Sequence, residues 1–272
     1  MQPLTAFHSV ALESLPVEDA IAFVARHGYD AIELNAETLP WARPHVTDAT
    51  PPQEREKIRR AVAEAGLAIS SISAHIPLAP PDEEERQRAV AFTKGCIDLA
   101  VDLGTDIVHG LAGEPAPGQD LDQAWPALVD SVRACTEYAA QRNVRFAFEA
   151  VTGMIVHNVA SLQRLLDEVP GLYVNFDPSH LAVEGDDIPA AVAALADKIV
   201  HCHFKDALGK PGDYKFPPLG EGKVDLQAFL QALRRNGYRG YISVEYEGHV
   251  FGYEEEIEKT AEKSLRFIKA NW

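Results

Sequence analysis

The chain has 272 residues, 46% hydrophobic and 24% charged, and a chain of this length folds without a metal or disulfide staple. Its 25 basic and 41 acidic residues leave a net charge of −16, which repels phosphate backbones and disfavours a nucleic-acid surface. Three cysteines without disulfide or C-x-x-C spacing are typical of a reducing compartment, so a cytoplasmic protein is expected. The first residues lack the features of a signal peptide, and no apolar run approaches the roughly 20 residues of a membrane span.

Short apolar runs alternate along the chain with longer amphipathic stretches. Their length and flanking turn residues predict strands at 4–12, 30–35, 68–75, 106–113, 145–153, 173–181, 199–206 and 241–248. Helical spacing of apolar residues predicts helices at 17–28, 52–66, 83–104, 123–142, 158–169, 188–197, 225–237 and 253–270. Four of these helices run into a glycine that suits a left-handed end: Gly28, Gly66, Gly104 and Gly237. Proline-rich stretches at 40–52, 77–81, 115–117 and 211–218 are typical of loops.

Eight strands that each precede a helix predict an α/β fold, a single (β/α)8 TIM barrel that forms one domain over residues 1–272. The structural alternative is a doubly wound open sheet. Such a sheet normally has a glycine-rich phosphate turn after its first strand, and ALESLP (residues 11–16) is not one. We therefore expect the barrel.

Polar residues gather where the predicted strands end, which is where a barrel carries its active site. They are Glu33, Asn35, His75, His109, Glu149, Asp177, His180, His201, His203, Lys205, Asp206, Glu245 and Glu247. Carboxylates and imidazoles without clustered cysteines suit one divalent ion such as Mn²⁺, Co²⁺, Mg²⁺ or Zn²⁺. Strand alternation puts His201 on the face of His203, and Glu245 on that of Glu247, and leaves open which member of each pair reaches the ion.

Six motifs follow one another along these strands: GYDAIEL (28–34), FEAVTG (148–153), FDPSHL (176–181), HCHFKD (201–206), LGEGKVD (219–225) and GYISVEYEG (240–248). In this order they resemble the xylose-isomerase-like barrels, which include sugar isomerases, sugar epimerases and the endonuclease IV enzymes. The resemblance covers essentially the whole chain. It implies that the ion is held by Glu149, Asp177, His203 and Glu245, and that His180 faces the substrate.

The resemblance also implies a reaction on hydroxy-carbonyl compounds. The ion acts as a Lewis acid, a carboxylate removes the acidified carbon-bound proton, and a cis-enediolate results. Glu149 and Glu245 are the candidate base and acid, with pure ligation as their alternative role. Further candidates for substrate binding are His75, His109, Lys205, Glu33 and Trp41. Lys205 has an alternative role as an ion-pair partner of Asp206 or of a ligand carboxylate.

Two departures from the family pattern argue against an endonuclease and against an unphosphorylated ketohexose as the substrate. Endonuclease IV completes its three-zinc site with an Asp-x-His before the Gly-Glu-Gly loop, where this chain has Tyr214, Lys215 and Phe216. The ketose 3-epimerases have a substrate-binding arginine six residues after the strand-seven histidine, and that position is Gly209 here. The leading hypothesis is therefore a metal-dependent isomerase or epimerase of a small sugar or keto-polyol.

Three alternatives stay open: an inosose or dehydroshikimate dehydratase, an endonuclease, and a sugar-binding barrel without activity. The dehydratases share the four-ligand pattern and begin with the same proton abstraction, but then expel a β-hydroxyl. Because relatives often form dimers or tetramers, we expect a homo-oligomer that binds neither nucleic acid nor membrane.

Overall fold

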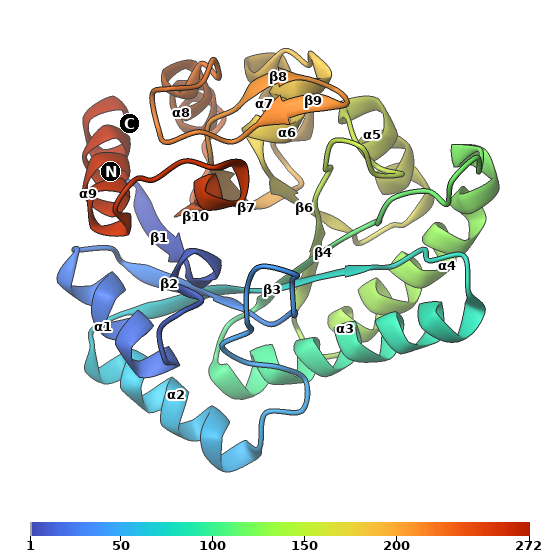
Figure 1. Ribbon diagram of the computed structural model, residues 1–272. Coiled ribbons are helices and arrows are strands. Elements are labelled where there is room, and N and C mark those ends of the chain that lie inside the picture. Colours follow the sequence, from blue (N-terminus) through green and yellow to red (C-terminus); the bar gives the residue numbers. More distant parts are fainter. Residues whose placement is uncertain (1) are drawn as a thin grey trace.

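Eight parallel strands close into a barrel in the order β1, β10, β7, β6, β5, β4, β3, β2, which confirms the predicted architecture. The structure, a computed structural model, describes residues 2–272. The barrel strands are β1 (Leu4–His8), β2 (Ala31–Asn35), β3 (Ala68–Pro77), β4 (Ile107–Leu111), β5 (Arg145–Phe148), β6 (Tyr173–Phe176), β7 (Ile199–Phe204) and β10 (Tyr241–Val244). Figure 1 shows the helices as a ring around these strands, with the colours following the ring in chain order.

The helices alternate with the strands as the sequence predicts. They are α1 (Val17–Arg26), α2 (Pro52–Glu64), α3 (Glu83–Leu103), α4 (Leu121–Ala140), α5 (Val159–Glu168), α6 (Pro178–Glu184), α7 (Ile188–Leu195), α8 (Leu226–Arg235) and α9 (Ile257–Asn271). Two 3-10 turns, η1 (Ser9–Leu12) and η2 (Gly248–Phe251), follow β1 and β10. Helix α3 illustrates the local signals, because Asp82 accepts a hydrogen bond from Glu85 N at its start and Gly104 has φ 81° at its end.

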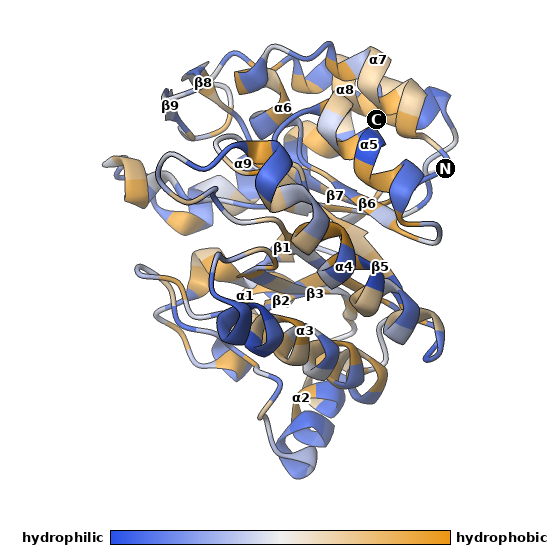
Figure 2. Ribbon diagram, turned by 90° about the vertical axis from the view of Figure 1, so that its right-hand side faces the viewer, coloured by the Kyte–Doolittle hydropathy of each residue, from blue (hydrophilic) through white to orange (hydrophobic). Residues whose placement is uncertain are grey.

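Strand alternation separates an apolar outer layer from a polar barrel interior. Phe176 of β6 stacks on Phe229 of α8 with ring centroids 5.5 Å apart, and Phe204 of β7 packs on Phe267 of α9 at 5.9 Å. The residues next to these phenylalanines, Asn175 and His203, are buried and polar. In Figure 2 the strands are largely hydrophobic, whereas hydrophilic residues lie on the outer helices such as α2. A barrel of this kind usually fills its interior with branched apolar side chains, so the polar interior marks a functional site.

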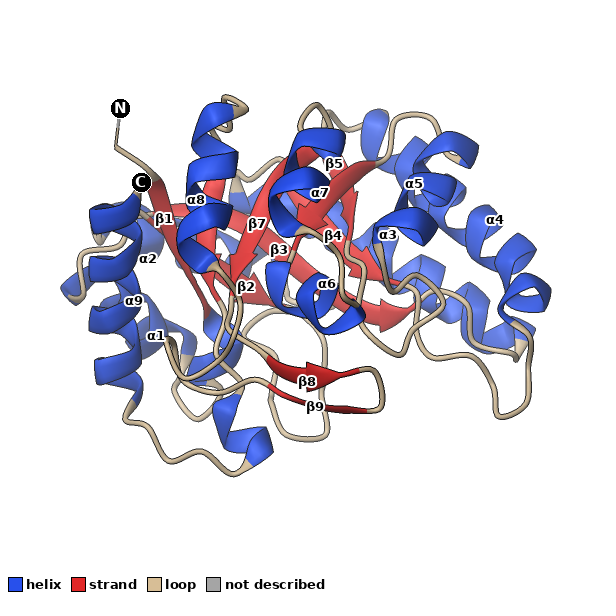
Figure 3. Cartoon of the chain, turned by 90° about the horizontal axis from the view of Figure 1, so that it is seen from above, coloured by secondary structure: helices blue, strands red, loops and turns tan. Residues whose placement is uncertain are grey.

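Several predicted strands are shorter than expected: 4–12 ends as a strand at His8 and continues as η1, and 145–153 and 241–248 end as strands at Phe148 and Val244. Two further segments change type. The segment 173–181, predicted as one strand, ends as a strand at Phe176 and continues as helix α6. Pro178 occupies the first turn of that helix, and Asp177 caps it by accepting a hydrogen bond from Ser179 N at 2.7 Å. The second is a hairpin, β8 (Leu208–Lys210) with β9 (Asp213–Lys215), where a loop was predicted at 211–218. Figure 3 shows this hairpin outside the barrel beside α6.

No helix within residues 2–272 has both the length and the apolar character needed to cross a membrane.

The three cysteines are expected to be unreactive while the chain is folded. Cys96, Cys135 and Cys202 are free and buried, and burial raises the pKa of the Cys135 thiol to about 12 and that of the other two well above the ordinary value. Because the thiolate is the reactive form, Ellman's reagent should modify none of them at mildly alkaline pH, and all three after denaturation in guanidinium. Rapid modification of the native protein would contradict this expectation.

Candidate active site

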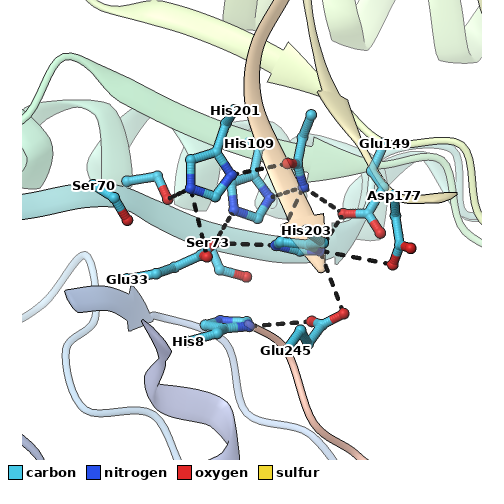
Figure 4. Close-up of polar contacts among 12 residues, drawn as sticks. His8, Glu33, Ser70, Ser73, His109, Glu149, Asp177, His201, His203 and Glu245 are labelled. Atoms are coloured by element: carbon cyan, nitrogen blue, oxygen red, sulfur yellow. Dashed lines mark hydrogen bonds and ion pairs between the residues drawn. The ribbon is translucent and has the colours of Figure 1, made fainter. Parts of the chain in front are cut away.

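The four residues that the sequence predicts as metal ligands meet at the carboxyl end of the barrel. Glu149, Asp177 and Glu245 follow strands β5, β6 and β10 directly, and His203 is the penultimate residue of β7. Each contributes a ligand atom that lies within 4.8 Å of the other three. His203 Nδ1 is 3.3 Å from Glu245 Oε2 and 3.4 Å from Glu149 Oε2. We call this set the tetrad (Figure 4).

The electrostatics of the tetrad suit a divalent cation. All four side chains are buried, and Asp177 Oδ2 and His203 Nδ1 make no hydrogen bond with any part of the chain that the structure describes. Burial alone would raise the pKa of Glu149 and Glu245, but the charge of His203, joined at Glu245 by Lys205, holds both pKa values well below the ordinary value. Three carboxylates and one imidazole are ligands for Mn²⁺, Co²⁺, Mg²⁺ or Zn²⁺, so the residues fit such an ion.

A separate partner orients each tetrad carboxylate. Asn175 Nδ2 donates to Glu149 Oε2 at 2.7 Å, and His8 Nδ1 lies 3.1 Å from Glu245 Oε1. Asp177 is held through its Oδ1 by the cap of α6. His8 and Asn175 were not predicted as site residues, although their positions in the sequence carry a usable signal. His8 is the last residue of its strand, and Asn175 lies two residues before Asp177 on the face that alternation turns inward.

Lys205 forms ion pairs with ligand carboxylates, which was the alternative to substrate binding that its position in the sequence suggested. Its side chain is 4% exposed, and Nζ lies 3.0 Å from Glu247 Oε2 and 3.1 Å from Asp177 Oδ2, and also contacts Glu245 Oε2. The pKa of Lys205, which burial would lower, is raised well above the ordinary value by these carboxylates. The ammonium group therefore neutralises part of the negative charge of the tetrad. Contact with a substrate remains a prediction for this residue.

His180 lies on α6, facing the tetrad. Its Nε2 is 3.7 Å from Asp177 Oδ2 and 3.9 Å from Glu149 Oε1, and its ring packs edge-on against Phe216. Burial, and then the charge of Lys205, lower its pKa to about 4. The ring is therefore neutral near pH 7, a form in which it donates one hydrogen bond and accepts another.

His75, His109 and Glu33 form a chain of contacts into the barrel. His75 Nε2 lies 2.8 Å from His109 Nδ1 and 3.3 Å from Glu149 Oε2, and His109 Nε2 contacts Glu33 Oε1. The His75 side chain is 12% exposed, whereas those of His109 and Glu33 are 0% exposed. Only His75 of the three can therefore meet a substrate without a rearrangement. Glu37, which the sequence analysis passed over, is also buried here, and its Oε2 accepts a hydrogen bond from His75 N.

Trp41 lies in the loop after β2 and packs edge-on against His249 of η2 with ring centroids 5.3 Å apart. The structure leaves its predicted contact with substrate untested. Tyr214 and Phe216, at the place of the missing endonuclease ligands, pack against Phe251 of η2 instead. These two positions thus serve an apolar cluster beside the site.

Comparison with known proteins decides the family. The profile of the xylose isomerase-like TIM barrel family matches residues 21–271, which is nearly the whole chain. The chain belongs to this family.

This xylose isomerase-like barrel has relatives that match it over most of its length. UlaE of Salmonella paratyphi A, named as an L-ribulose-5-phosphate 3-epimerase, is 25% identical over 232 residues, which cover 80% of this chain and 78% of UlaE. YcjR of E. coli, a 3-keto-D-glucoside 4-epimerase, matches in structure with a TM-score of 0.81 at 17% identity, over 99% of this chain and 100% of YcjR. The IolI protein, solved with a zinc atom, matches with a TM-score of 0.80 at 20% identity, over 99% of this chain and 98% of IolI.

The Gly-Glu-Gly loop of this xylose isomerase-like barrel is anchored by a buried carboxylate. Asp206 accepts hydrogen bonds from the backbone N–H groups of Ala207, Gly220, Gly222 and Val224, at 2.9 to 3.2 Å. A Cβ on Gly222 would lie 2.0 Å from Asp206 Oδ1, so this close approach requires glycine. Glu221, between the two glycines, is exposed. The loop is therefore held by Asp206, which explains why this residue does not pair with Lys205.

Asp206→Asn is expected to lower the free energy of unfolding by about 1–3 kcal/mol, because one carboxylate oxygen becomes an amide that faces backbone donors. Urea unfolding measures the difference. Asp213→Asn, on the exposed β9, is the control and should stay within about 0.5 kcal/mol of the wild type. Equal stability of the two variants would show that the backbone contacts of Asp206 contribute nothing.

Proposed function

We propose that this chain is a divalent-metal-dependent epimerase or isomerase of a small sugar or keto-polyol, acting by proton transfer through a cis-enediolate. One observation carries the proposal: Glu149, Asp177, His203 and Glu245 place four ligand atoms within 4.8 Å of one another in a buried site. The similarity to UlaE, a sugar-phosphate epimerase by name, supports this reaction class. The zinc atom of IolI supports the need for a cation.

The tetrad would hold one cation among Mn²⁺, Co²⁺, Mg²⁺ and Zn²⁺, through Glu149, Asp177, His203 and Glu245. When bound, the cation supplies Lewis-acid polarisation of the substrate carbonyl and the adjacent hydroxyl, which acidifies the hydrogen on the neighbouring carbon. Every other step belongs to the side chains of the chain itself.

Glu149 and Glu245 are the proposed proton carriers. They come from β5 and β10, which β6 and β7 separate in the barrel, so they approach a substrate from different directions. Asn175 Nδ2 donates a hydrogen bond to Glu149 Oε2, so Oε1 is the oxygen that would take up a substrate proton. In an epimerisation, one glutamate begins ionised and removes a proton from one face, the other begins protonated and delivers to the opposite face, and the two exchange states.

His180 and Lys205 would orient the substrate oxygens. His180 Nε2 faces Asp177 and Glu149, which places it where a substrate hydroxyl would meet the tetrad. We propose further substrate contacts for His75 and Trp41 at the mouth. His109 and Glu33, both fully buried, would support the site from beneath rather than touch the substrate.

The remaining expectations follow from the composition and from relatives. The free cysteines suit a reducing compartment, so we propose a cytoplasmic enzyme. We also propose that the barrel is one domain that assembles into a homo-oligomer. Analytical ultracentrifugation measures the oligomeric state directly.

Proton NMR in deuterated water tests the reaction class, with the metal-stripped and the Mn²⁺-restored protein side by side. The panel holds L-ribulose 5-phosphate, unphosphorylated ketoses, 3-keto-glucosides, hydroxypyruvate, an inosose and dehydroshikimate. We expect deuterium at a carbon next to a carbonyl, only in the presence of the cation, together with an epimer or isomer of the substrate.

Three results would redirect the proposal. Loss of water from the product would establish the dehydratase alternative, which shares the first proton abstraction. Absence of exchange across the panel, with one cation bound per chain, would favour the sugar-binding barrel without activity. Three zinc ions per chain and tight DNA binding at low salt would favour the endonuclease.

A further inference from the structure

The His203 ring lies between two carboxylate environments inside the barrel. On one side, Nδ1 faces the tetrad oxygens of Glu149 and Glu245, at 3.4 and 3.3 Å. On the other side, Nε2 lies 3.3 Å from Glu33 Oε1, and both side chains are 0% exposed. Figure 4 shows this arrangement, with Glu33 on the side of His203 opposite Glu149 and Asp177.

Cation binding through Nδ1 requires one particular tautomer of His203. The lone pair of Nδ1 must be free for the cation, so the ring hydrogen must be on Nε2 and needs an acceptor there. Two side-chain atoms lie within hydrogen-bonding distance of Nε2 in residues 2–272, Glu33 Oε1 and Asn175 Nδ2, each at 3.3 Å.

Asn175 cannot be that acceptor, because its own partners fix the orientation of its amide. Nδ2 lies 2.7 Å from Glu149 Oε2, which only accepts, and Oδ1 lies 2.9 Å from His201 Nδ1. Nδ2 is therefore an NH₂ group and a donor. Without Glu33, this donor would favour a lone pair on His203 Nε2 and a hydrogen on Nδ1, the tautomer that cannot bind a cation.

All the side-chain partners of Glu33 in the described chain are imidazoles, and the four side chains Glu33, His109, His201 and His203 lie close enough to form a group of their own. Besides His203, Glu33 contacts His109 Nε2, and it lies 3.6 Å from His201 Nε2, while its Oε2 makes no hydrogen bond within the described chain. No lysine or arginine among residues 2–272 pairs with it. Its burial at 0% exposure keeps it away from a substrate.

We propose that Glu33 is a positioning residue that holds the hydrogen of His203 on Nε2 and thereby prepares Nδ1 for the cation. This replaces the substrate contact that the sequence suggested for Glu33. The inference rests on the proposed function, because it assigns Glu33 a role toward the cation of the tetrad. Carboxylates that hold the second nitrogen of a metal-binding histidine typically contribute 10- to 100-fold to metal affinity, and we expect about this contribution here.

The test compares Glu33→Met, which fills the volume without a strong acceptor, with Glu33→Gln, whose amide oxygen can still accept. Zn²⁺ affinity is measured by competition with a chromophoric chelator, and the visible spectrum of bound Co²⁺ reports the ligand geometry. Glu37→Gln is the matched control, since it removes a second buried carboxylate, in the loop that follows β2, without touching His203. Circular dichroism and thermal unfolding establish that each variant is folded.

We expect Glu33→Met to weaken Zn²⁺ binding by about 10- to 100-fold and to alter the Co²⁺ spectrum, and Glu37→Gln to leave both unchanged. Glu33→Gln should recover most of the affinity and remain about three- to tenfold weaker than the wild type, because a neutral acceptor binds less strongly than a carboxylate. A folded Glu33→Met with wild-type Zn²⁺ affinity would overturn the inference. If that variant does not fold, Glu33→Ala, which also lacks an acceptor, takes its place, and wild-type Zn²⁺ affinity in a folded Glu33→Ala does the same.

Failure of the proposed function would look different. In that case the wild-type protein itself would bind no cation at the tetrad, or would bind one without proton exchange in any substrate. If only the inference about Glu33 is wrong, the wild-type protein still binds the cation and still catalyses proton exchange.

Discussion

Glu149→Gln and Glu245→Gln are each expected to lower kcat/KM for epimerisation by about 10²- to 10⁴-fold, because an amide neither removes nor delivers the substrate proton. Both carboxylates are buried in the tetrad, and the nearby positive charges hold the pKa of each well below the ordinary value, which favours the ionised form that acts as the base. The other glutamate carries the proton that is delivered to the opposite face. Turnover and cation content are measured together, and rates are compared at full loading with the cation. Loss of the rate at full loading separates proton transfer from ligation.

Deuterium exchange from the two separate epimers sharpens this prediction. Each glutamine variant should lose exchange from the epimer whose proton faces the missing carboxylate, and should retain exchange from the other epimer. Glu221→Gln is the control, since that carboxylate is exposed in the Gly-Glu-Gly loop, and its turnover should stay within about twofold of the wild type. Unchanged turnover in both tetrad variants would exclude Glu149 and Glu245 as the proton carriers.

Removal of the cation is expected to have the second large effect. Dialysis against a strong chelator should abolish turnover, and one equivalent of Mn²⁺ or Co²⁺ per chain should restore it. The stripped protein should also be less stable, because a cation that binds the folded state at 100 times its Kd stabilises that state by about 2.7 kcal/mol. Thermal unfolding with and without the cation measures this difference.

The matched variant for this experiment is His203→Gln, which removes the one imidazole of the tetrad. Its melting temperature should respond much less than that of the wild type to added Mn²⁺ or Co²⁺. A cation that stabilises both proteins equally binds elsewhere on the chain, and full turnover of the stripped wild type would rule out a metal-dependent reaction.

The sequence by itself determined the barrel and the ends of the strands that carry the site. Alternating strand and helix patterns, with glycines such as Gly104 at helix ends, predicted eight strand–helix units, and the closed sheet confirms them. These signals are local in the chain, so they survive without knowledge of the packing. The ends of parallel strands necessarily meet at one edge of the barrel, which is why the polar residues there could be grouped as one candidate site. The resemblance to a known family then named the four tetrad residues among them.

Only the tertiary structure showed where each member of the paired residues lies and what holds it. Alternation grouped His201 with His203 and Glu245 with Glu247, but their depth in the barrel depends on strand tilt and register. The structure places His203 and Glu245 in the tetrad, His201 deeper beside Asn175, and Glu247 on Lys205.

The contacts that hold the tetrad residues could not be predicted from the sequence either. His8 and Glu245 are 237 residues apart in the chain, and Glu33 and His203 are 170 apart, so no local pattern connects them. Closure of the barrel brings them together, and burial then demands that each polar atom find a partner. The local structure could therefore be derived from neighbouring residues, whereas the network around the tetrad required the closed barrel.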